Sequence, residues 1–146
     1  MNTHKFSQHH TRIFRIITAL AGLLLLSVPA LSQSPRVIEV LADANSHFKI
    51  PGQNRAEISV KAGEPLLLRI EAHKGKSWNR DGAVHGFTLL RAKDHVRVPG
   101  WDFELQEGVQ EFSINAPSAP GKYEVVCTVI CSGDHEGMRM KFEVLP

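Results

Sequence analysis

The sequence of 146 residues contains only two cysteines and has no C-x-x-C-H motif for attaching a c-type haem. Two cysteines are too few for a disulfide-stabilised scaffold. No apolar run reaches the roughly 20 residues that a membrane-spanning helix needs. Hydrophobic residues make up 42% of the chain and charged residues 22%. This balance is ordinary for a globular protein and excludes intrinsic disorder and a coiled coil.

The charge is distributed unevenly along the chain. Of the 17 basic residues, Lys5, Arg12 and Arg15 lie in the first 32 residues, whereas all 15 acidic residues follow, so 14 cations face 15 carboxylates in the remainder. A nearly neutral domain argues against nucleic-acid binding, which requires a clustered basic face.

Residues 1–32 have the organisation of a secretory signal peptide. Arginines precede an apolar run over residues 16–28, and the segment Ala30-Leu31-Ser32 offers small residues at the −3 and −1 positions of a cleavage site. We therefore expect residues 33–146 to form one domain, periplasmic or otherwise exported, with no membrane span after signal cleavage. An uncleaved N-terminal anchor is the alternative.

The exported part has the hydrophobic period of short strands. From Leu66 to Ala72, every second side chain is apolar and the face opposite carries Arg69 and Glu71, which is the pattern of a half-buried strand. Further strands are predicted over residues 36–41, 56–60, 86–90, 110–114, 122–127 and 138–145. Residues 74–81 and 91–108 are predicted to be the longer connections. About seven short strands predict an all-β, antiparallel two-sheet sandwich.

Candidate metal ligands gather near the C-terminus, in the segment CTVICSGDHEGM. Cys127, Cys131, His135 and Met138 follow one another at spacings of four, four and three residues. Sulfur and imidazole ligands favour copper or zinc over calcium or magnesium. His85, at a predicted strand, is the upstream candidate. Two His, one Cys and an axial Met would make a mononuclear blue-copper centre, which leaves Cys127 without a role.

The C-x3-C-x3-H-x2-M loop with a separate upstream His resembles the binuclear CuA site of cytochrome c oxidase subunit II and nitrous-oxide reductase. Residues 37–145 are also similar to the cupredoxin family at large. The resemblance implies a cupredoxin-like antiparallel Greek-key β-sandwich that holds two copper ions. By position, the implied ligands are Cys127 and Cys131 as bridging thiolates, His85 and His135 as imidazole ligands, Met138 as a weak axial ligand, and the backbone carbonyl of Val129.

The chain differs from subunit II in having a signal peptide where subunit II has two transmembrane helices. We therefore expect a free-standing, monomeric electron carrier rather than an enzyme, because protein ligands fill the coordination positions and leave none for a substrate. Its partner would be a cytochrome c or a terminal reductase, in the service of an oxidase or a denitrification enzyme. A copper carrier or assembly factor, a mononuclear cupredoxin and a structural Cys127–Cys131 disulfide are the alternatives.

Overall fold

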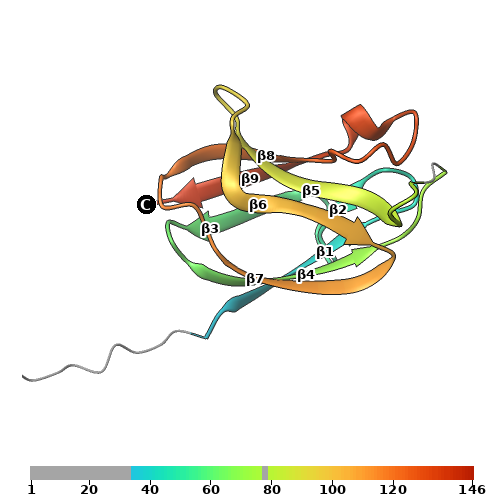
Figure 1. Ribbon diagram of the computed structural model, residues 1–146. Helices are drawn as coiled ribbons and strands as arrows, with labels where there is room; N and C mark the ends of the chain where they lie inside the picture. Colours follow the sequence, from blue (N-terminus) through green and yellow to red (C-terminus); the bar gives the residue numbers. More distant parts are fainter. Residues whose placement is uncertain (1–33, 77–78) are drawn as a thin grey trace, which may run out of the picture. The chain divides into compact units, whose positions relative to one another are not determined.

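The computed structural model describes residues 34–76 and 79–146, so the predicted signal peptide lies outside the described residues. Within these ranges the chain forms nine strands and one short 3-10 helix, and the strands make two sheets that face each other (Figure 1). No helix in the described ranges is long and apolar enough to cross a membrane.

The first sheet has four strands in the order β2-β1-β4-β7. They are β2 (Phe48–Lys49), β1 (Arg36–Ala42), β4 (Pro65–Ala72) and β7 (Gly108–Asn115). The second sheet has five strands in the order β3-β9-β8-β5-β6. They are β3 (Glu57–Lys61), β9 (Arg139–Leu145), β8 (Gly121–Val126), β5 (Ala83–Arg91) and β6 (Arg97–Gln106).

The core lies between the sheets and follows the predicted alternation. Leu66, Leu68 and Ile70 of β4 are fully buried, whereas Arg69 and Glu71 between them are exposed. Burying each such side chain contributes roughly 1.5–3 kcal/mol. The predicted all-β sandwich is thus confirmed, and each of the seven predicted strands matches an observed one to within a few residues.

Two features differ from the sequence prediction. The sheets are mixed rather than purely antiparallel, because β1 pairs with β4 and β3 pairs with β9 in parallel. After β1 and β2 the chain crosses to the second sheet for β3 and then returns as β4 beside β1. Side-chain alternation indicates which face of a strand is buried but not the direction of the partner strand. The sequence pattern therefore could not predict this crossover.

The second difference is β6, which lies in the segment predicted to be a connection. The prediction treated residues 91–108 as a connection, but Pro99 and Gly100 lie within the strand, where its pairing with β5 is irregular. Thr88 pairs with Asp102 and Leu90 with Arg97, so β6 has extra residues, a bulge, between these two pairs. An edge strand tolerates a proline there, since the missing N–H breaks no ladder bond.

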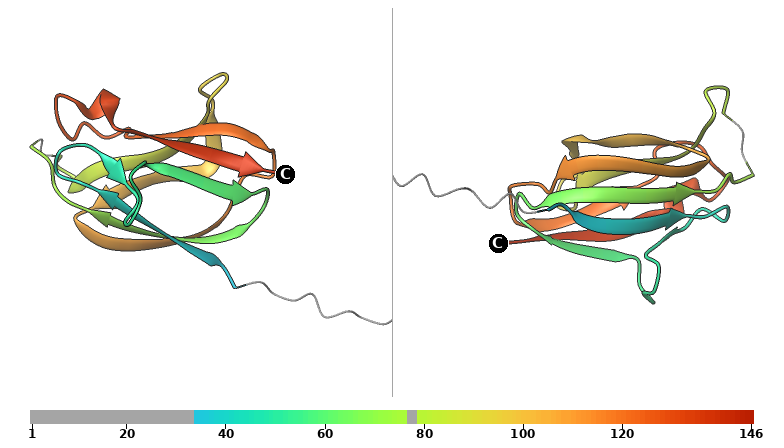
Figure 2. Two further views of the ribbon diagram at one scale, coloured as in Figure 1. Left: turned by 180° about the vertical axis from the view of Figure 1, so that it is seen from behind. Right: turned by 90° about the horizontal axis from the view of Figure 1, so that it is seen from below.

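Three connections meet at one end of the sandwich and position the candidate site. They are the β1–β2 turn, the β4–β5 connection and the β8–β9 connection, which contains the 3-10 helix η1 (His135–Gly137). In both views of Figure 2 the β8–β9 connection, drawn in red, lies at the same end as the β1–β2 turn.

Candidate metal centre

His85 lies in β5 and is fully buried. Its Nε2 is 2.9 Å from the backbone carbonyl oxygen of His73. A carbonyl only accepts hydrogen bonds, so Nε2 carries the proton and Nδ1 keeps its lone pair. Nδ1 is buried and has no hydrogen-bond partner among the described residues. A metal-binding histidine has this arrangement, in which one ring nitrogen is anchored to a carbonyl and the other is left free to bind the ion.

Cys127 follows directly after β8, and its sulfur contacts both the neighbouring strand and its own loop. The backbone N–H of Gly86 donates to Cys127 Sγ at 3.3 Å. The same sulfur lies 3.1 Å from the carbonyl oxygen of Val129 and 3.7 Å from Cys131 Sγ. The residues between the two cysteines therefore fold back, so that the Val129 carbonyl faces Cys127 Sγ.

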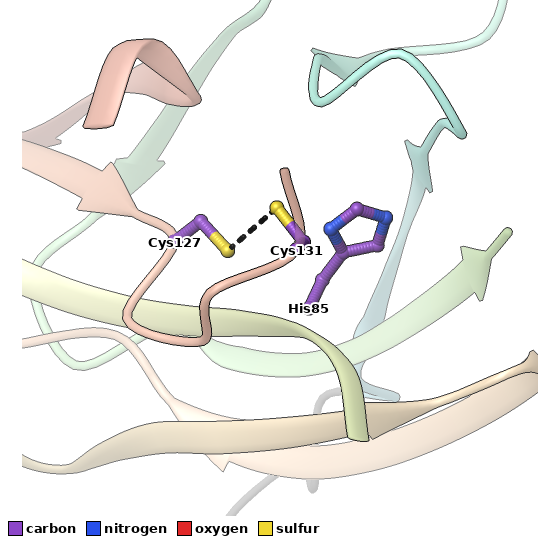
Figure 3. Close-up of side chains that lie close together, drawn as sticks. All are labelled: His85, Cys127 and Cys131. Atoms are coloured by element: carbon purple, nitrogen blue, oxygen red, sulfur yellow. Dashed lines mark hydrogen bonds between the residues drawn. The ribbon is translucent and has the colours of Figure 1, made fainter. Parts of the chain in front are cut away.

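His85, Cys127 and Cys131 form one compact group of potential ligands (Figure 3). One donor atom from each residue lies within 4.8 Å of the donor atoms of the other two, and all three residues are buried. The separation of 3.7 Å between the sulfurs is less than twice a metal–sulfur bond of about 2.3 Å, so one ion can contact both. The donor set fits a soft transition-metal ion.

Both cysteines are free thiols in the structure. Their sulfurs lie 3.7 Å apart, well beyond the roughly 2.05 Å of a disulfide bond. The structure therefore does not contain the alternative Cys127–Cys131 disulfide.

The two remaining predicted side-chain ligands lie in the same loop, and His135 is not a member of the compact group. His135 is half-buried in η1, and its Nδ1 is 3.2 Å from the carbonyl oxygen of Ser132. Met138 is fully buried, and its carbonyl accepts a hydrogen bond from the N–H of Cys127 at 3.1 Å. Among the described residues, His135 does not form a second such group with Cys127 and Cys131.

Gly86 allows the ligand loop to approach β5. A Cβ atom at this position would lie 2.7 Å from the backbone nitrogen of Thr128 and 2.5 Å from its Oγ1. A side chain here would push the loop away from the strand that carries His85. Neither Gly86 nor the His73 carbonyl was identified from the sequence. The position of Gly86 next to His85 is the one available signal.

Burial shifts the pKa values of two of the grouped residues in opposite directions. Burial lowers the pKa of His85, which favours the neutral imidazole that a metal requires. Burial also raises the pKa of Cys127 to about 11, against the lowering effect of hydrogen bonds with Gly86 and Val129. A metal ion must therefore displace a proton from Cys127, whereas the lower pKa of His85 favours the neutral imidazole, which has a free lone pair on Nδ1.

No protein-family model and no curated protein matches the sequence. Among solved structures, auracyanin A, a "blue" copper protein from Chloroflexus aurantiacus, is 21% identical with a TM-score of 0.54, and the match covers 77% of this chain and 100% of that chain. Auracyanin from Roseiflexus castenholzii is 16% identical, with a TM-score of 0.52 and coverages of 78% and 100%. A chain of a heme-copper terminal oxidase dimer is 20% identical, with a TM-score of 0.50 and coverages of 79% and 68%. The chain therefore has the cupredoxin-like fold predicted from its sequence.

Proposed function

We propose that this chain is an exported electron-transfer protein that carries a binuclear, CuA-type copper centre. Cys127 and Cys131 would bridge two copper ions, and His85, His135, Met138 and the Val129 carbonyl would complete the ligand set. The observation that carries the proposal is the pair of free, buried sulfurs 3.7 Å apart, with the lone pair of His85 Nδ1 beside them.

The surroundings of these ligands favour electron transfer. A bridged copper pair supplies one-electron chemistry in which the charge is shared by both ions. The protein restrains the ligands from outside, since the His73 carbonyl anchors His85 and the Gly86 N–H anchors Cys127. Restraint of this kind limits the movement of ligands between oxidation states and tunes the potential of the metal.

The position of Cys127 supports a centre with two ions over a mononuclear one. In a mononuclear cupredoxin Cys127 would be a bystander, free to face the core or the solvent. Instead its sulfur lies between the Gly86 N–H and Cys131 Sγ, within the same group of donors as His85. The auracyanin A match, described as a "blue" copper protein, keeps the mononuclear centre as the competing hypothesis.

Burial of the sulfur ligands supports an electron carrier over a copper carrier. A protein that delivers copper must present a ligand to its recipient, whereas Cys131 is 1% exposed and Met138 is 0% exposed. Ile130, next to Cys131, is 63% exposed and offers an apolar contact close to the metal. A cytochrome c or a terminal reductase, the kind of partner that the resemblance to subunit II implies, would dock there.

A pair of variants tests the number of copper ions. In a binuclear centre Cys127→Ser and Cys131→Ser both abolish the two-copper spectrum, because each thiolate bridges both ions. In a mononuclear centre only one of the two cysteines binds the ion, so one of the two variants keeps the copper and its colour. Met140→Leu, in β9 and buried in the core, is the control for a conservative change nearby. Retention of an unchanged spectrum in Cys127→Ser would contradict the proposal.

A further inference from the structure

Ser46 lies in the β1–β2 turn, far from the ligand loop in sequence but in contact with it. Its side chain is buried, at 3% exposure. Its Oγ is 3.6 Å from Cys131 Sγ and 2.6 Å from Ser132 Oγ. Its backbone has a φ of 63°, in the left-handed region that non-glycine residues seldom occupy.

The neighbouring residues of the turn hold Ser46 in this conformation. The carboxylate of Asp43 accepts hydrogen bonds from the backbone N–H groups of Asn45 at 2.9 Å and His47 at 3.0 Å. The carbonyl of Asp43 accepts one from the N–H of Ser46 at 3.1 Å. Lys49 Nζ lies 2.6 Å from the Asp43 carboxylate. A strained backbone that several surrounding contacts hold in place is typical of functional positions.

The available protons allow these hydrogen bonds to run in one direction, toward Cys131. Either hydroxyl could donate between Ser46 and Ser132. Ser132 Oγ already accepts the backbone N–H of Asp134 at 3.0 Å, and its own proton is available to Ser46 Oγ. Ser46 Oγ then accepts from Ser132 and has one proton of its own to donate. A metal-bound Cys131 is a thiolate and only accepts. In this arrangement the series of hydrogen bonds runs from the Asp134 N–H through Ser132 and Ser46 to Cys131 Sγ.

We propose that Ser46, supported by Ser132, is a positioning residue that donates a hydrogen bond to the metal-bound sulfur of Cys131 and raises the reduction potential of the centre. This inference rests on the proposed function only in that Cys131 binds copper. A hydrogen bond withdraws electron density from the thiolate and so favours the reduced ion, and hydrogen bonding around the cysteine sulfur is a recognised control of potential in copper sites. Two linked hydroxyls polarise each other and strengthen the final bond.

Ser46→Gly and Ser46→Ala, each in the copper-loaded protein, test the inference. Both remove the hydroxyl, but only Gly suits a φ of 63°. We expect both to raise the ratio of oxidised to reduced protein about tenfold at a fixed potential, a lowering of about 59 mV for a one-electron couple. The sulfur-to-copper absorption band should move to longer wavelength, with unchanged copper content. Ser132→Ala should shift the potential in the same direction by less.

His95→Gly is the matched control, because His95 in the β5–β6 connection also has a positive φ, of 55°. It should leave the potential and the absorption band unchanged. An unshifted potential in both Ser46 variants would overturn the inference, as would a shift confined to Ser46→Ala, which would be a backbone effect. One copper per chain in the unmodified protein, with the potential still shifted in both Ser46 variants, would overturn the two-ion centre alone. A chain that takes up no copper would overturn both.

Discussion

Replacing Gly86 with alanine would test how closely the ligand loop must approach β5. The new Cβ would lie 2.5 Å from Thr128 Oγ1, 2.7 Å from Thr128 N and 3.1 Å from Val129 N. Ordinary contacts between such atoms are about 3.5 Å, so the loop must move by about 1 Å. Backbone atoms cannot rotate out of the way as a side chain does, and Gly86 itself is held in the strand.

The size of the effect follows from two contributions. Overpacking a well-packed site costs about 1–3 kcal/mol of the free energy of unfolding. The same movement lengthens the hydrogen bond from the Gly86 N–H to Cys127 Sγ, now 3.3 Å, and a bond to a charged acceptor is worth about 1.5–3 kcal/mol. The second loss applies chiefly to the metal-bound thiolate. We therefore expect Gly86→Ala to lower copper affinity by more than it lowers the stability of the copper-free protein.

Chemical denaturation with and without copper, together with a chelator competition, measures both quantities. Gly133→Ala is the control in the same loop, because a Cβ at Gly133 meets nothing within 4 Å. It should leave stability and copper affinity close to their original values. If Gly86→Ala bound copper as tightly as the unmodified protein, with the same free energy of unfolding, the close approach of loop and strand would be refuted.

Three further predictions concern the copper-free protein, the core and the partner surface. Burial raises the pKa of Cys127 from 9.0 to about 11. The protonated thiol should therefore stabilise the copper-free protein below pH 9.0, and this contribution should be lost as the pH rises toward about 11. If the free energy of unfolding of Cys127→Ser fell with pH in the same way as that of the unmodified protein, this prediction would be contradicted. Leu68→Ala, at a fully buried position in β4, should lower the free energy of unfolding by about 2–5 kcal/mol in a urea titration, and a loss below about 1 kcal/mol would place Leu68 outside the packed core. Ile130→Lys, at an exposed position beside Cys131, should slow electron exchange with a cytochrome c in stopped-flow measurements and leave the reduction potential unchanged, whereas an unchanged rate would exclude Ile130 from the docking surface.

The fold was largely predictable because its strands alternate clearly. Apolar and charged residues alternate from Leu68 to Ala72, and this run became β4 as predicted. β6 was missed because Pro99 and Gly100 are turn residues by composition, and only the pairing with β5 shows that they lie in a bulge. Local composition cannot report an irregularity that depends on a neighbouring strand.

The candidate site was predictable as far as its donors are chemically distinctive. Cys127 and Cys131 stand out by residue type and spacing, and the structure places both beside His85. The contacts that orient these ligands cannot be recognised in the sequence. Every residue has a backbone carbonyl like that of His73, and Ser46 is an ordinary turn residue. Its contact with Cys131 joins residues 85 positions apart in the sequence, so it requires the folded chain. The roles of His135 and Met138 as ligands stay predictions.

Copper content and the electron paramagnetic resonance spectrum of the purified, copper-loaded protein test the central claim most directly. The proposed centre predicts two copper ions per chain that share one unpaired electron, seen as a hyperfine pattern from two equivalent copper nuclei. One copper ion per chain with the pattern of a single nucleus would contradict a binuclear centre and establish a mononuclear cupredoxin. A single, readily exchanged cuprous ion without a signal would contradict electron transfer and indicate a copper carrier.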